Sequence, residues 1–167
     1  MLEALRSIEV RGKTCLDLGT GTGILAIDMA RRGCLTVASD VSMDSCLLAR
    51  RNSALNGVYV EVVQGDLARH FRDLSFDIVA FNPPYLPLRG ESEQWSGGEL
   101  GRELIDSLLI DLPRLLRDGG AALLLHADFN DPILTIKRAR ALNLSAKIIG
   151  RKKLSFHELM VVMVRKD

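Results

Sequence analysis

The segment Asn82-Pro83-Pro84-Tyr85 combines residue types that could do chemistry on a planar NH2 group. Such a nitrogen is a poor nucleophile because its lone pair is delocalised, so an enzyme must accept both N–H groups and aim the nitrogen at an electrophile. The Asn82 side-chain oxygen and the Pro83 carbonyl could accept them, and neither proline has an N–H that competes. The Tyr85 ring offers a face for a planar group. The spacing predicts methyl transfer to a planar amino group, although a lone Pro-Pro pair is also a common strand terminator.

A glycine-rich turn precedes this segment in the chain. Gly19, Gly21 and Gly23 follow an apolar run, and a turn of this kind after the first strand of a parallel sheet lets a ligand approach the backbone. The dinucleotide fingerprint GxGxxG would need its third glycine at the position of Ile24. A pyrophosphate ligand is therefore disfavoured.

Two aspartates follow the next two apolar runs. Asp40 could accept hydrogen bonds from both ribose hydroxyls of a nucleoside, which suits NAD and S-adenosylmethionine equally. Asp66 could accept from an adenine amino group. Each could instead cap a following helix, which for Asp66 would be a short helix from Leu67 to Phe71. The ordered series of a glycine turn and two aspartates favours nucleoside binding.

Short apolar runs alternate with stretches of helical period, as in a parallel sheet covered on both faces. The sequence therefore predicts an α/β fold in one domain, residues 1–167. No helical period separates the last two strands, so they should pair as an antiparallel hairpin. Strands are expected at Thr14–Leu18, Leu35–Ser39, Val58–Val63, Phe76–Phe81, Ala121–His126, Ser145–Ile149 and Leu159–Val164. Helices are expected at Ile24–Arg32, Met43–Leu55, Glu99–Arg117 with an interruption at Pro113, and Asp131–Leu142.

Composition excludes several classes of protein. Hydrophobic residues are 47% and charged residues 26% of 167, which excludes a disordered chain. The 22 Lys and Arg residues nearly balance 21 Asp and Glu residues, which argues against a dedicated non-specific nucleic-acid binder. No apolar run is long enough to span a membrane and no signal peptide is visible, so we expect a cytoplasmic protein with no membrane partner.

The remaining reactive residue types show no catalytic pattern. The three cysteines lack a CxxC pair and are expected to be buried free thiols, with no metal site and no disulfide framework: Cys15, Cys34 and Cys46. The histidines lack metal-like spacing and are assigned no catalysis: His70, His126 and His157. Trp95, in the long loop Leu86–Gly98, is expected to contact substrate or pack in a lid rather than anchor the core. Short basic clusters are interpreted as solvated surface that could still contact a partner: Arg50-Arg51, Lys137–Arg140 and Arg151-Lys152-Lys153.

Taken in order, these motifs resemble those of class I S-adenosylmethionine-dependent methyltransferases. The stretch from Trp95 to Glu103 resembles the loop and helix start that follow NPPY in archaeal and eukaryotic HemK-like protein-glutamine N5-methyltransferases. The resemblance implies a Rossmann-like seven-stranded sheet of order 3-2-1-4-5-7-6 with strand 7 antiparallel. It also implies a substrate, the glutamine of the GGQ motif in a class I translation release factor.

The resemblance assigns roles to individual residues. Asp17, Gly19 and Gly21 would bind the methionine end of S-adenosylmethionine. Asp40, with its neighbour Val41, would bind at the ribose. Asp66 and Leu67 would bind the adenine. Asn82, Pro83 and Tyr85 would act on the target amide. The family's acidic segment that closes over the cofactor has no counterpart in Met1 to Lys13, so this lid is expected to be truncated or absent.

Two alternative functions and one partner remain open. The same NPPY geometry serves methylation of a base amino group in RNA or DNA, although a duplex would require base flipping and a recognition surface. A non-catalytic subunit with a methyltransferase fold is the other alternative. Strand 3, expected at Val58–Val63, would be an apolar sheet edge that invites strand addition. The resemblance implies that a small zinc-binding activator protein docks there, while the alternative is an edge protected by Glu61 and sheet twist.

Overall fold

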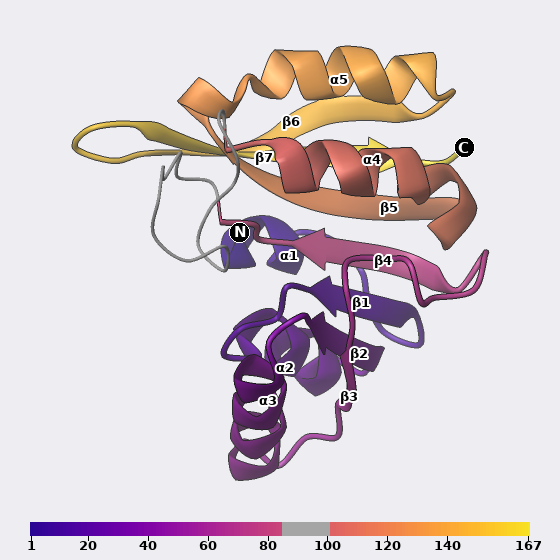
Figure 1. Ribbon diagram of the computed structural model, residues 1–167, viewed down its shortest axis with the longest axis vertical. Coiled ribbons are helices and arrows are strands. Elements are labelled where there is room, and N and C mark those ends of the chain that lie inside the picture. The colour runs from indigo at the N-terminus through magenta and orange to yellow at the C-terminus, as the bar shows by residue number, and fades with distance from the viewer. Residues whose placement is uncertain (85–100) are drawn as a thin grey trace.

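One mixed sheet organises the computed structural model, which describes residues 1–84 and 101–167 (Figure 1). Its strands lie in the order β3-β2-β1-β4-β5-β7-β6, parallel from β3 to β5 and antiparallel where β7 meets β5 and β6. The expected strand order and the antiparallel hairpin are confirmed. The strands are β1 (Thr14–Leu18), β2 (Leu35–Asp40), β3 (Glu61–Gln64), β4 (Phe76–Phe81), β5 (Leu116–Ala127), β6 (Ser145–Lys153) and β7 (Glu158–Arg165).

The helices begin where the sequence supplies a turn or a cap. They are α1 (Leu2–Arg6), α2 (Ile24–Arg31), α3 (Met43–Leu55), α4 (Glu103–Leu115), the 3-10 turn η1 (Asp128–Asn130) and α5 (Pro132–Ala141). Ser42 caps α3 by accepting a hydrogen bond from the Ser45 N–H. Asp131 caps α5 in the same way, and Pro132 occupies its first position, where a missing N–H costs nothing.

Two apolar layers cover the sheet. On one face α4 and α5 pack against β-strand side chains such as Leu16, Val79 and Leu124. On the other face α1 and α2 pack against Cys15, Leu123 and neighbouring residues. Alternate residues of the central strands therefore enter opposite cores, as the period of two in a strand requires.

The carboxyl ends of the parallel strands meet at one edge of the sheet. Gly19, Val41, Asn82 and Asp128 each follow the last residue of such a strand. The turn between β6 and β7 lies at the same edge, because β6 runs antiparallel to β7 and β7 antiparallel to β5. Figure 1 shows this turn extending beyond the arrowheads of β1 and β4. This is the edge at which open α/β sheets bind ligands.

Several expected boundaries were wrong. β3 is shorter than Val58–Val63, because only Glu61–Gln64 pairs with β2. α4 begins at Glu103 and continues through Pro113 to Leu115, because a proline so near the end of a helix removes only one terminal hydrogen bond. β5 begins at Leu116, inside the expected helix and before the expected strand start at Ala121, and its pairing with β4 shifts register between Phe76 and Ile78.

The expectation of three free thiols was also wrong. Cys15 on β1 and Cys34, just before β2, form a disulfide with a Cα–Cα distance of 6.2 Å. β1 and β2 are adjacent and parallel, with Cys15 opposite Thr36, so the two sulfurs meet within the same core layer. Cys46 is a buried free thiol. The pairing depends on strand register, which the spacing of cysteines in the sequence does not reveal.

None of the helices among the described residues is long and apolar enough to cross a membrane.

Candidate active site

The glycine turn after β1 depends on backbone conformations that favour glycine. Gly19, Gly21 and Gly23 have φ angles of 62°, 53° and 82°. A Cβ on Gly23 would lie 3.1 Å from the Ala49 backbone, so this glycine lets α3 approach the start of α2. A Cβ on Gly21 would meet no atom within 4 Å, so the turn faces open space there. The turn therefore packs against α3 at Gly23 and faces open space at Gly21, where a ligand could approach.

Asp17 stabilises the glycine turn through two hydrogen bonds. Its Oδ2 atom accepts hydrogen bonds from the Thr20 hydroxyl at 2.7 Å and from the Ala26 N–H at 3.0 Å, which ties the turn to the first residues of α2. The side chain is buried, and burial raises its pKa to about 7. A direct contact between Asp17 and a ligand stays a prediction, and the observed role of its carboxylate is to shape the turn.

Asp40 ties the same turn to the end of β2. Its Oδ2 atom accepts from the Gly21 N–H at 2.9 Å, and its Oδ1 atom accepts from the Ser42 N–H at 3.0 Å. Ser42 rather than Asp40 caps α3, so the helix-cap alternative is wrong. The carboxylate is half-buried, and each oxygen retains a lone pair that can accept a further hydrogen bond. Asp40 therefore lies where a diol beside the glycine turn could be bound.

The third strand end is more exposed. Asp66 forms an ion pair with Arg69, with an N–O distance of 2.6 Å, and no helix follows it, so its helix-cap alternative is also wrong. Leu67 has a φ of 47° and is half-buried. The His70 ring lies over Gly65, where any Cβ would clash with it, and its Nε2 atom is 3.4 Å from the Ser39 hydroxyl. The contact between the His70 ring and Gly65 constrains the path of the chain just after β3.

Asn82 lies beside the glycine turn. β4 pairs with β1 so that Phe81 is opposite Leu18, and Asn82 and Gly19 are the next residues of their chains. A Cβ on Gly19 would be 3.3 Å from the Phe81 ring, so β4 supports the turn directly. Asn82 is exposed and Pro83 is buried. Tyr85 and Trp95 lie outside the described residues.

Two supporting residues could not be identified from the sequence. Asn52 on α3 donates a hydrogen bond to the Thr22 carbonyl at 2.8 Å and so holds the glycine turn from the other side. Arg102, almost fully buried, donates to both Asp106 carboxylate oxygens and to the Asn130 and Asp131 carbonyls. It thereby joins the start of α4 to the start of α5. The Thr22 partner of Asn52 lies 30 residues away, and the carbonyl partners of Arg102 lie 28 and 29 residues away, although its ion pair with Asp106 is local.

Comparison with known proteins agrees with this geometry. The family described as Methyltransferase small domain matches residues 1–131. The chain belongs to this methyltransferase family. A putative protein N5-glutamine methyltransferase of Methanocaldococcus jannaschii is 31% identical over 93% of this chain and 82% of its own length. The resemblance to HemK-like enzymes is therefore confirmed.

Two further relatives extend the comparison. A release factor glutamine methyltransferase of Chlorobaculum tepidum is 37% identical over 68% of this chain but only 45% of its own length, so the chain spans less than half of that bacterial enzyme. The E. cuniculi Mtq2–Trm112 complex, described as responsible for methylation of the eRF1 termination factor, matches with a TM-score of 0.83 and 26% identity. The match covers 99% of this chain and 92% of the other. The class I methyltransferase fold is confirmed along the whole described chain.

Proposed function

We propose that this chain transfers a methyl group from S-adenosylmethionine to the side-chain nitrogen of the GGQ glutamine in a class I translation release factor. The observation that carries the proposal is the adjacency of Asn82 and the Gly19 turn at the carboxyl edge of the sheet. A glutamine amide bound by Asn82 would face a ligand bound at the turn. The names of the relatives from M. jannaschii, C. tepidum and E. cuniculi support the choice of substrate.

The residues at the edge fit an adenosyl cofactor. The turn is open at Gly21, and the free lone pairs of Asp40 can accept from ribose hydroxyls. Val41, whose side chain is exposed, follows at the same strand end. Asp66 and Leu67, at the end of β3, would meet the adenine. Asp17 would act through the turn that it holds.

The chemistry needs an oriented nitrogen rather than a strong base. The bound cofactor supplies a sulfonium methyl group, and the glutamine nitrogen supplies the electron pair of the new N–C bond. The Asn82 Oδ1 atom and the Pro83 carbonyl would accept the two N–H groups and aim that electron pair at the methyl carbon. The methyl–sulfur bond would break as the N–C bond forms, its electron pair would stay on the sulfur as a neutral thioether, and the methylated nitrogen would release one proton to solvent. Tyr85 would cover the planar amide.

A methyl-transfer panel tests this function. Labelled S-adenosylmethionine is mixed with the chain and one acceptor at a time: release factor, its GGQ Gln-to-Ala variant, tRNA, rRNA or DNA. We expect label in release factor alone and none in the variant. Label in a nucleic acid but not in release factor would support the base-methylation alternative. Label in no acceptor, with or without a partner protein, would support the non-catalytic alternative.

We also propose that a small zinc-binding activator protein docks at the β3 edge. The E. cuniculi relative was solved in complex with Trm112. Within the described residues β3 pairs with β2 alone, and the preceding Tyr59 side chain is 81% exposed. Tyr59 donates a hydrogen bond to Glu61, so it lies along the edge rather than in the core. This arrangement leaves both backbone and aromatic surface for a partner strand.

The docking proposal is tested by co-purification with a candidate activator. Tyr59→Lys should abolish the complex, because it places a charge in the apolar contact, whereas the matched Tyr59→Phe should retain it. Equal recovery of the activator with both variants would contradict docking at this edge. A wild-type chain that is monodisperse and fully active alone would contradict the need for an activator.

A further inference from the structure

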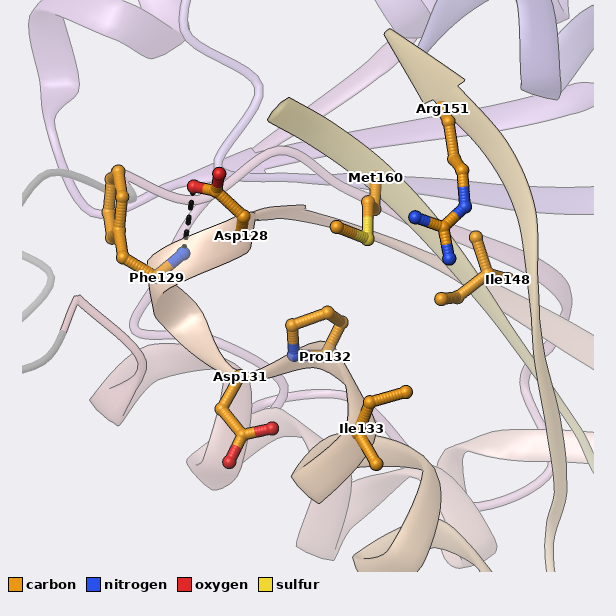
Figure 2. Close-up of a pocket in the computed structure, with 8 residues that line it drawn as sticks. All are labelled: Asp128, Phe129, Asp131, Pro132, Ile133, Ile148, Arg151 and Met160. Carbon is orange, nitrogen blue, oxygen red and sulfur yellow. Dashed lines mark hydrogen bonds between the residues drawn. The ribbon is translucent and has the colours of Figure 1, made fainter. Parts of the chain in front are cut away.

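A hollow lies at the far side of the active edge, between the β6–β7 hairpin and the segment Asp128–Ile133 (Figure 2). It has a volume of about 370 Å³, and a second hollow of about 380 Å³ adjoins it at the hairpin turn, with Asp128 common to both. Pro132, Ile148 and Met160 give the first hollow an apolar lining. These residues come from α5, β6 and β7, so only the tertiary fold assembles them.

Exposed apolar side chains surround the two hollows. Phe129 is 44% exposed and Ile133 51% exposed at the first hollow, and Phe156 is 97% exposed at the hairpin turn. A large aromatic side chain so fully exposed next to a hollow is typical of a protein-binding surface.

The charges around the hollows are mixed in sign. The Asp128 carboxylate accepts from the Phe129 and Glu158 N–H groups, and Arg151 forms an ion pair with Glu158 at 3.0 Å. Lys153, which lines the second hollow, is exposed and forms no ion pair with the described residues. This lysine is therefore available for a carboxylate of a partner. The neighbouring aspartates argue against a nucleic-acid backbone, which needs a continuous basic surface.

The hollows lie within reach of a substrate bound at Asn82. Phe81 at the end of β4 is opposite Leu124 on β5, and β5 continues to Ala127 opposite Leu159 on β7. With strands about 4.8 Å apart and about 3.3 Å per residue along them, the hairpin is roughly 10 Å from Asn82 at Met160 and roughly 20 Å at its turn. A folded protein whose glutamine enters the active edge would cover this distance, whereas a GGQ tripeptide, at about 3.3 Å per residue, would not reach the turn.

We infer that these hollows and the hairpin form a docking surface for the body of the protein substrate. The substrate places an apolar side chain between Phe129, Ile133 and Met160, and one of its carboxylates pairs with Lys153. This inference rests on the proposed function and adds the part of the surface that selects a folded release factor over a free peptide.

Paired substitutions at the hairpin test the inference. Phe156→Ser should raise KM for intact release factor by about tenfold or more, and Lys153→Glu should raise it several-fold, with kcat unchanged in both. Both should leave the rate on a short GGQ peptide and the affinity for S-adenosylmethionine unchanged. Lys147→Glu is the matched control, since Lys147 is an exposed lysine on β6 away from the hairpin turn, and it should behave as wild type.

A binding measurement makes the result independent of turnover. The GGQ Gln-to-Ala release factor cannot be methylated, so its binding to the chain can be measured alone. Its Kd should be higher for the hairpin variants than for the wild-type chain, and it should depend less on salt concentration. An unchanged KM and Kd would overturn the docking surface while the proposed function stands. Variants that lose tRNA affinity but keep release-factor KM would show an RNA surface instead. A wild-type chain that methylates RNA and not release factor would overturn both proposals.

Discussion

The two halves of the sheet differ in how their functional surfaces are built. At the β1–β2–β3 end, the candidate residues lie at or just beyond the ends of strands, and hydrogen bonds join neighbouring strand ends, such as that from the Gly21 N–H to Asp40. At the β5–β7–β6 end, the hollow is lined by residues from η1, α5, β6 and β7, which are up to 32 positions apart between Asp128 and Met160. The surface at β1–β2–β3 is built from turns at strand ends, whereas the surface at β5–β7–β6 is built from side chains of several elements that pack together.

This difference matches the two ligands that the halves would bind. A cofactor is a small molecule of constant structure. A glycine turn with carboxylates at the strand ends can bind it through groups whose positions the backbone sets. A protein substrate presents a broad surface, which apolar side chains and unpaired charges from several elements can match. Asn82 lies between the halves, where β4 joins β1 to β5.

The largest expected effect is at this junction. Asn82→Ala removes one of the two acceptors that would orient the target amide, and loss of such a positioned group costs about 2.7 to 4 kcal/mol of transition-state stabilisation. The kcat on release factor should fall by about 100- to 1,000-fold. The side chain is exposed, so its removal leaves no cavity, and thermal stability and cofactor affinity should be unchanged. Activity within tenfold of wild type would contradict the role of Asn82.

A smaller effect is expected in the cofactor half. Asp40→Ala leaves the Gly21 and Ser42 N–H groups without their acceptor and removes the expected ribose contact. Hydrogen bonds to charged groups contribute about 1.5 to 3 kcal/mol each, so the Kd for S-adenosylmethionine should rise by about 10- to 100-fold. Asp40→Asn keeps one oxygen and should lose less affinity. Calorimetry that shows no change in Kd for Asp40→Ala would contradict this assignment.

The same contrast explains what could be predicted from the sequence. The strands and the Gly19, Asp40 and Asn82 positions were accessible because apolar runs and turn residues are local signals, whereas the strand order followed from the resemblance to class I methyltransferases. Boundaries such as β3 were missed because strand length depends on pairing with β2. The Cys15–Cys34 bond, Arg102 and the hollow at Met160 were missed because each depends on contacts between distant residues.

The disulfide should stabilise the cofactor half in particular. It closes a loop that contains the glycine turn, with a sequence separation of 19, and a loop of this size gives about 3 kcal/mol in the chain-entropy view. Reduction, or the double change Cys15→Ala with Cys34→Ala, should lower the unfolding free energy by about this amount. Reducing agent should not affect the double variant further. Titration of three free thiols in the unreduced, denatured chain would contradict the bond.

The smallest net effect is on the pH dependence of stability, because one buried group in each half acts in opposite directions. Burial raises the pKa of Asp17 to about 7, from an ordinary 3.8. Between these values the folded chain holds a proton that the unfolded chain has released, so stability falls as pH rises. Burial, aided by Arg102, lowers the pKa of His126 from 6.5 to about 4. Between pH 4 and 6.5 the unfolded chain holds a proton on this histidine that the folded chain lacks, so stability falls as pH drops.

Single substitutions should separate the two contributions. Asp17→Asn keeps an oxygen that can accept from Thr20 and Ala26, and it should gain stability relative to wild type as pH rises from 4 to 7. The His126 ring nitrogens have no hydrogen-bond partner among the described residues, so His126→Leu should lose little stability at pH 7. The stability of this variant relative to wild type should then increase as pH falls from 6.5 to 4. Urea unfolding across pH 4 to 7.5 measures both slopes. Parallel curves for wild type and either variant would show that the substituted group does not titrate as its burial requires.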